Sequence, residues 1–222
     1  MSHIVHTLDR SLLEELTALL AGGENVTTLW LPGGGRTRFG LELQNSDPLS
    51  EFFPDKNNKI PIIFIYLDYT LDHIAIESQL KDVLSDHSNE TRKREMVRDV
   101  LAKGYRIVLV LDNYTYLRPE TSQFLFSIRS IDIDAITFLI FQLESDFAQS
   151  TQTVPSLESS THAFHNVIRM PYMRPETARI WIVERARSLD LTATDRLVDE
   201  VFSFGGGIPV LLKKRSAWTE TL

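Results

Sequence analysis

The chain contains no cysteine, which excludes disulfide bonds and thiolate metal sites. Its apolar runs are far shorter than the roughly 20 residues that a membrane-spanning helix needs. The first residues lack the basic-then-apolar pattern of a secretory signal, so we expect a cytoplasmic protein with no membrane partner. The formal net charge of −7 argues against a surface that coats nucleic acid.

The composition is that of an ordinary globular protein, with 43% hydrophobic and 24% charged residues in a chain of 222. This length is enough for one large domain or for one domain with a small appendage. Apolar runs predict strands at 26–31, 60–67, 106–111, 136–141 and 167–170. Amphipathic patterns predict helices at 11–20, 72–84, 91–103, 120–131, 176–189, 194–204 and 208–218, and a weak helix from 37 toward 53. Residues 142–165 are rich in Ser, Thr and Gln and predict a loop.

The four longer strands are apolar throughout, which is typical of strands buried on both faces of a parallel sheet. Because helices separate them, we expect right-handed crossovers and a three-layer α/β fold. We assign residues 1–170 to this core and residues 171–222 to a small helical subdomain. Ligands of such sheets bind at the carboxyl ends of the strands, where the glycines at 33–35 and Asp112 are expected.

A glycine-rich segment directly follows the first strand. A phosphate-binding loop has Gly, four residues, Gly, Lys and then Ser or Thr. The residues at these four positions are Trp30, Gly35, Arg36 and Thr37, so two positions are kept and two are altered. Glycines let backbone N–H groups converge on a phosphate, and a helix that begins near Arg36 adds its positive end. The predicted phosphate-binding residues are Gly33, Gly34, Gly35, Arg36 and Thr37.

Two oxygen-bearing side chains are candidate ligands of Mg²⁺. Thr37 can supply a hydroxyl, and Asp112, at the end of an apolar strand, fits the carboxylate that holds the metal in P-loop proteins. Alone, three glycines after a strand can be a tight turn, and an Asp after a strand is often a cap or turn residue. Their joint occurrence after the first and third strands favours a P-loop fold.

The order of motifs resembles the AAA+ ATPases of the STAND and origin-recognition (Orc/Cdc6-like) type. The segments that carry the resemblance are 29–37 (Walker A), 107–113 (Walker B), 124–131 with 136–141 (the helix and the sensor 1 strand), 170–189 (the entry to a helical lid) and 205–212 (the lid's Gly-Gly-x-Pro-x-x-Leu segment). The resemblance implies a module that binds ATP or ADP with Mg²⁺, and it places Pro209 near the nucleotide base.

Several positions depart from this family pattern. Asn113 stands where the family has the glutamate that polarises the attacking water, and an amide cannot act as a general base. Arg36 replaces the loop lysine with a larger, planar cation. Trp30 replaces the first loop glycine, and Gln142 stands near the polar sensor 1 position without matching it. The departures predict a degenerate site with weak or no hydrolysis.

Three functions are compatible with these residues. The first is a nucleotide-binding module that acts as a switch or assembly subunit. The second is a structural pseudo-ATPase whose old site is filled by side chains such as Trp30 and Arg36. The third is a slow ATPase whose base comes from elsewhere or whose site is completed by a neighbouring subunit's arginine. The candidate arginines are Arg118, Arg129 and Arg174, and the alternative role of each is a solvated helix face or a salt bridge. Each of the three functions implies a protein partner or a homo-oligomer, with nucleic acid reached only through the assembly.

Overall fold

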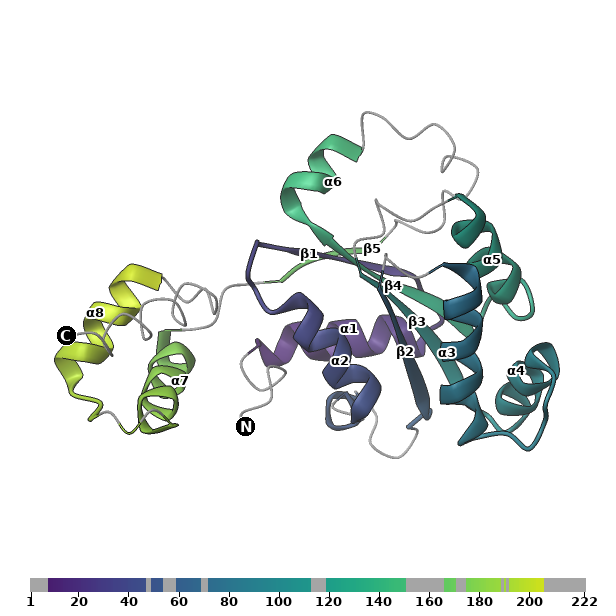
Figure 1. Cartoon of the computed structure of the whole chain (residues 1–222), viewed down its shortest axis with the longest axis horizontal. Helices are drawn as coiled ribbons and strands as arrows, with labels where there is room; N and C mark the ends of the chain where they lie inside the picture. The colour runs from purple at the N-terminus through teal and green to yellow at the C-terminus, as the bar shows by residue number, and fades with distance from the viewer. Residues whose placement is uncertain are drawn as a thin grey trace.

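The computed structural model describes residues 8–46, 49–53, 59–68, 72–112, 119–150, 166–170, 175–188, 190 and 192–205. The elements, in chain order, are α1 (Arg10–Ala21), β1 (Val26–Trp30), α2 (Arg36–Asn45), the 3-10 helix η2 (Ser50–Phe52), β2 (Ile62–Asp68), α3 (His73–Ser85), α4 (Lys93–Ala102), β3 (Arg106–Asp112), α5 (Pro119–Arg129), β4 (Ile136–Leu143), α6 (Glu144–Ser150), β5 (Asn166–Arg169), α7 (Pro175–Ser188) and α8 (Asp195–Gly205). Figure 1 shows their arrangement around one sheet.

The sheet is parallel, with strand order β2-β3-β4-β1-β5. From β1 the chain passes to the far edge strand β2 and then returns through β3 and β4. Because all strands run the same way, the carboxyl ends of β1 and β3 lie at the same edge, on either side of β4. The predicted three-layer α/β fold is confirmed.

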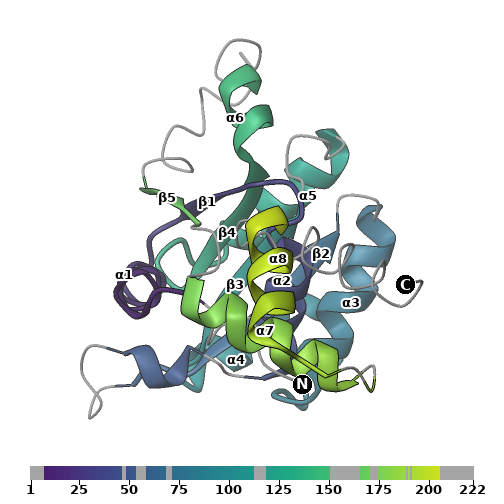
Figure 2. The same ribbon diagram turned by 90° about the vertical axis from the view of Figure 1, so that its left-hand side faces the viewer.

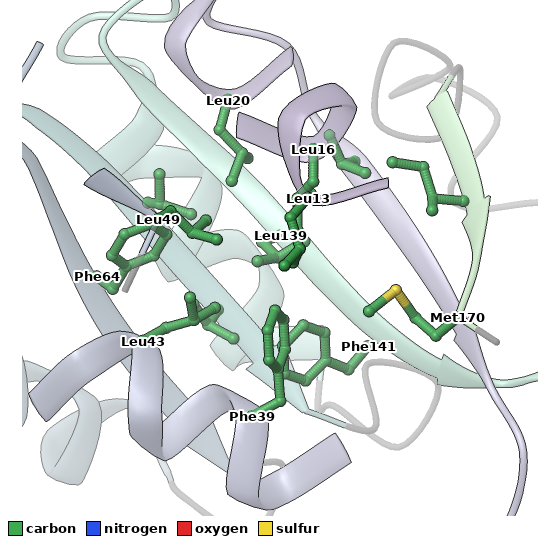
Figure 3. Packing of buried hydrophobic residues seen from close by; sticks show 14 of the residues in the cluster. Leu13, Leu16, Leu20, Phe39, Leu43, Leu49, Phe64, Leu139, Phe141 and Met170 are labelled. Atoms are coloured by element: carbon green, nitrogen blue, oxygen red, sulfur yellow. The ribbon is translucent and has the colours of Figure 1, made fainter. Parts of the chain in front are cut away.

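Helices cover both faces of the sheet (Figure 1). On one face, α1 and α2 supply Leu13, Leu16, Leu20, Phe39 and Leu43 to a core that includes Phe64, Leu139 and Phe141 from the strands (Figure 3). On the other face, α3, α4 and α5 pack against the alternate strand residues. Successive side chains of a strand point to opposite faces. Val108 and Val110 face α1 and α2, so Asp112 also belongs to the α2 face.

The prediction of a loop at 142–165 is wrong for residues 142–150. Strand β4 continues to Leu143, and α6 follows directly. Gln142 is buried, with 3% of its surface exposed, because it extends the ladder opposite Leu29 of β1. Pairing with a central strand here overrides a polar composition. Residues 151–165 lie outside the described part of the chain.

The other predicted boundaries agree with the structure or differ from it by one or two residues. The weak helix predicted from 37 toward 53 is two elements, α2 and η2. The separation follows the backbone at Ser46, which is extended and ends α2. Of the predicted carboxyl-terminal helices, α7 and α8 are present, and the helix at 208–218 lies outside the described residues.

Helices α7 and α8 pack against each other to one side of the sheet (Figures 1 and 2). Their shared cluster buries Ala178, Ile182, Val198 and Val201 and is separate from the two clusters on the sheet. The division into a core of 1–170 and a subdomain of 171–222 stays a prediction. In the described residues we find no helix with the length and apolar character that a membrane crossing requires.

Candidate functional site

The glycine loop makes a sharp turn between β1 and α2. Gly33 and Gly35 have φ angles of 77° and 91°, in the left-handed region that other residues rarely adopt. The amide of Gly34 donates to the carbonyl of Leu31 at 3.0 Å. A Cβ atom at position 34 would lie 3.1 Å from that same carbonyl oxygen. Each glycine of the loop therefore has a geometric reason to be glycine.

Helix α2 begins at this loop without a side-chain cap. Gly35 is the N-cap, and it makes no side-chain capping hydrogen bond to the first turn. The first turn also carries no acidic residue. The N–H groups of Arg36 and Thr37 have no carbonyl of their own helix to pair with. They stand at the positive end of the helix dipole. Amides without an acceptor in their own helix, together with a positive helix end, suit an anion such as phosphate.

The centre of the site is Asp112, the last residue of β3, with only 1% of its surface exposed. The Arg36 Nε atom lies 2.6 Å from Asp112 Oδ1 and forms an ion pair with it. The Thr37 hydroxyl donates to Asp112 Oδ2 at 3.0 Å. The Tyr66 hydroxyl donates to the same Oδ2 at 2.6 Å. Three side chains from α2 and β2 thus converge on one buried carboxylate.

Tyr66 is a member of this cluster that the sequence reasoning missed. It lies on β2, and its main-chain N–H donates to Gln44 Oε1 of α2 at 2.8 Å. Gly40 of α2 faces the tyrosine ring so closely that any Cβ there would clash with it. The available signal was an aromatic hydroxyl two residues before the end of a strand whose other residues before Asp68 are apolar. It was not enough, because the contact depends on the register of β2 beside β3, which pairs Tyr66 with Val110 and so brings its hydroxyl to Asp112.

The electrostatics keep the tyrosine neutral and the carboxylate paired. Burial, followed by the hydrogen bond to Asp112, raises the pKa of the Tyr66 hydroxyl far above its ordinary value, so Tyr66 remains a donor at physiological pH. The Arg36 side chain is 14% exposed. Within the part of the chain that the structure describes, its buried Nε and Nη1 atoms have no hydrogen-bond partner, although Nε has its ionic contact with Asp112.

Trp30 stands at the position of the first loop glycine but points into the core. It is 1% exposed, and its indole N–H donates to Thr28 Oγ1 at 2.8 Å. Its ring centroid lies 5.5 Å from that of Phe39 and 5.7 Å from that of Phe141. The loop is thus built over the indole, and Trp30 belongs to the hydrophobic core beneath it.

The residues present fit a nucleotide phosphate, whereas Asp112, the candidate metal carboxylate, is already paired with Arg36. The loop is a cradle that a side chain at position 34 would narrow, and Arg36 brings buried N–H groups without hydrogen-bond partners. Thr37 and Asp112 offer the hard oxygen ligands that Mg²⁺ prefers. Within the described ranges, no group of three or more His, Cys, Asp or Glu residues is placed to hold a metal by itself.

No protein-family model and no curated protein matches the chain. Solved structures share its fold. The Orc1 protein of Aeropyrum pernix in complex with DNA matches with a TM-score of 0.57 and 15% identity, over 91% of this chain and 56% of that one. The RuvB Holliday junction branch migration motor of Thermotoga maritima matches with a TM-score of 0.51 and 14% identity, over 92% of this chain and 59% of that one.

The replication initiator DnaA bound to AMPPCP and single-stranded DNA matches with a TM-score of 0.53 and 14% identity, over 93% of this chain and 59% of that one. The fold is that of the AAA+ P-loop NTPases. The chain spans between 56% and 59% of the length of these three proteins. At such identities the similarity establishes the fold alone.

The predicted site residues divide into three groups according to where the structure places them. Gly33 to Thr37 and Asp112 come together at one edge of the sheet, although their role as ligands stays a prediction. Pro209, Asn113, Arg118 and Arg174 lie outside the described residues. Arg129 is at the opposite edge, where its Nε donates to the carbonyl of Ile136, the first residue of β4. There burial lowers the pKa of Arg129, and its guanidinium lies over the Phe138 ring.

Proposed function

We propose that this chain is a nucleotide-binding module that takes ATP or ADP at the loop 33–37 and hydrolyses it weakly or not at all. The observation that carries the proposal is the convergence of Arg36 and Thr37, the first two residues of an uncapped helix, on the buried carboxylate of Asp112. A glycine turn with a purely structural role would not require two residues of the following helix to converge on a buried carboxylate.

Phosphate would be held by the chain's own backbone and by one cation. The N–H groups at the start of α2 point out of the helix end, and the glycines leave room for the phosphate to approach them. Arg36 starts from the same turn and supplies positive charge. Thr37 and Asp112 are the oxygen-bearing residues that a magnesium ion would need, but Asp112 is already paired with Arg36.

The same cluster supports weak hydrolysis. A general base must accept a proton from the attacking water, but Asp112 already accepts from Thr37 and Tyr66 and is paired with Arg36. Tyr66 cannot act as the general base either, because its raised pKa keeps the hydroxyl protonated. The amide at position 113 adds no base. Binding without rapid turnover suits a switch or an assembly subunit.

The partner is proposed from charge and from the fold. Among the proteins that share the fold, the Orc1 protein was solved with DNA and DnaA with single-stranded DNA. Here the net charge is −7, which disfavours direct binding to a polyanion. We therefore favour a protein partner or self-assembly, with nucleic acid contacted only through the assembly.

Equilibrium titration with fluorescent ADP and ATP tests the proposal. Saturable binding by the wild-type chain, and loss of it in Gly34→Val, is expected, because that side chain would crowd the Leu31 carbonyl and shield the loop amides. Arg38→Lys is the matched control, since Arg38 is exposed and pairs with Glu42. Absence of saturable binding at millimolar nucleotide, with a melting temperature indifferent to nucleotide, would instead support a structural pseudo-ATPase. Phosphate release that rises with protein concentration would support a slow ATPase completed by a neighbouring subunit.

A further inference from the structure

The Arg36 side chain lies against Asp112, the carboxylate predicted from the sequence as a candidate Mg²⁺ ligand. Its Nε atom is 2.6 Å from Asp112 Oδ1, on the carboxylate that the fold offers to Mg²⁺. We propose that Arg36 replaces the divalent cation: it stays on Asp112 through Nε and turns the rest of its guanidinium toward the nucleotide phosphate. This inference rests on the proposed function and adds that nucleotide binding here is independent of Mg²⁺.

The first argument is the occupancy of the carboxylate. An ionised carboxylate has about four lone-pair sites for two oxygens. At Asp112, Oδ2 accepts from both Thr37 and Tyr66. Among the described residues Oδ1 accepts no hydrogen bond, but the positive Arg36 Nε lies 2.6 Å from it. Mg²⁺ demands near-ideal octahedral geometry and gives up its waters reluctantly. An ion would have to displace donors that are already seated, or stand against the positive guanidinium.

The second argument is the cost of moving Arg36 away. Asp112 is almost completely buried, and removing one partner of a buried ion pair leaves an uncompensated charge. Exchanging the guanidinium for a hydrated metal ion would also break the direct ionic contact. The resident side chain therefore has an advantage that a metal at ordinary concentrations must overcome.

The third argument is the shape of the guanidinium. It carries five N–H donors in a planar fork that matches carboxylates and phosphates. One of these donors, Nε, faces Asp112, while the side chain keeps 14% of its surface exposed beside the loop. Arg36 can therefore join the carboxylate to a phosphate, as a metal ion does through its coordination sphere. A lysine has one compact ammonium in place of this fork.

Tyr66 acts as a positioning residue in this arrangement. Its hydroxyl holds Oδ2 at 2.6 Å and thereby fixes the plane of the carboxylate with Oδ1 toward Arg36. The ring is confined by Gly40 on α2. Without the hydroxyl, Oδ2 has a free site that water or a metal ion can take.

The experiment is a titration of fluorescent ADP in excess magnesium chloride and in EDTA. The wild-type Kd should differ by less than about twofold between the two buffers, because the cation is part of the chain. Arg36→Lys should bind ADP at least about tenfold more weakly in EDTA than in magnesium. A compact ammonium cannot contact the carboxylate and the phosphate together as the planar guanidinium can, so a metal ion must neutralise part of the phosphate charge. Arg38→Lys should behave as the wild type, and Tyr66→Phe should shift partly toward Arg36→Lys.

The outcomes separate this inference from the proposed function. Wild-type binding that weakens tenfold or more in EDTA would overturn the role of Arg36 and leave nucleotide binding intact. No saturable binding in either buffer would overturn the proposed function itself. If Arg36→Lys fails to fold, Mn²⁺ titration of the wild-type chain decides, with the free ion followed by electron paramagnetic resonance. We expect no tight Mn²⁺ with ADP present, whereas stoichiometric Mn²⁺ would contradict the inference.

Discussion

The Nε atom of Arg36 lies 2.6 Å from Oδ1 of Asp112, across the junction between the first turn of α2 and the end of β3. This ion pair joins the altered position of the phosphate loop to the carboxylate of the third strand. Both side chains are largely buried, so each charge depends on the other for compensation. The stability of the chain should therefore respond to changes at the pair and at the residues packed around it.

Replacing Asp112 by alanine should destabilise the chain by about 3 kcal/mol, because it leaves the largely buried guanidinium of Arg36 unpaired. Urea unfolding followed by circular dichroism measures the loss. Asp99→Ala is the matched control: Asp99 also pairs with a cation, Lys103, but on the surface, and its removal should cost much less. Equal losses in the two variants would show that the Arg36–Asp112 pair is not a buried interaction.

Replacing Tyr66 by phenylalanine should cost about 1–3 kcal/mol at neutral pH, because a hydrogen bond to a charged group is lost while the ring remains. The variant should also lose a pH dependence. The folded pKa of Tyr66 is raised above the unfolded value of 10.0, so its contribution is complete below pH 10 and decreases as the unfolded chain ionises above it.

The measurement is the difference in unfolding free energy between wild type and Tyr66→Phe from about pH 8 to 11, with the unfolded tyrosine pKa near 10. Taking the difference cancels the other tyrosines and the lysines. We expect the advantage of the wild type to shrink above pH 10. A difference that stays constant across this range would contradict the assigned burial of the hydroxyl.

Restoring glycine at position 30 should harm the protein even though the P-loop pattern has glycine there. Trp30 is buried against Phe39 and Phe141, and emptying such a site costs at least about 3 kcal/mol. Trp30→Phe should be much milder, since the ring contacts are partly retained. Urea unfolding of both variants gives the comparison. A Trp30→Gly chain as stable as the wild type would show that the indole is not part of the core.

Gly40→Ala should push α2 away from β2, because the added methyl group would meet the Tyr66 ring and come within 3.0 Å of Phe141. Overpacking of this kind costs about 1–3 kcal/mol. Leu41→Ala, on the exposed side of the same helix, should stay within about 0.5 kcal/mol of the wild type. Thermal unfolding of both variants makes the comparison, and similar losses would argue against close packing at Gly40.

Much of the fold could be predicted from local patterns. Strands such as β3, with apolar residues at 107–111, are recognisable because burial on both faces leaves no polar position. The meeting of Thr37 and Asp112 followed from strand ends sharing one edge of a parallel sheet. These features depend on short stretches of sequence and on general rules of topology.

The remaining features depend on contacts between distant elements. The direction of the Arg36 side chain depends on how α2 lies across the sheet, and the approach of Tyr66 to Asp112 depends on the register of β2 with β3. No local pattern encodes either of them. Gln142 belongs to a strand because β1 pairs with it, although it is polar itself and a polar stretch begins at Glu144. The same tertiary contacts make Trp30, a candidate for filling the site, a core residue beneath the loop.

The central claim is that the loop at 33–37 holds nucleotide phosphate while Arg36 remains on Asp112. A crystal structure of the chain with ADP, grown without divalent metal, tests it most directly. We predict phosphate density at the N–H groups of Arg36 and Thr37, with the Arg36–Asp112 pair intact. An empty loop at millimolar ADP, or a phosphate bound only after metal is added and Arg36 has left Asp112, would contradict the account.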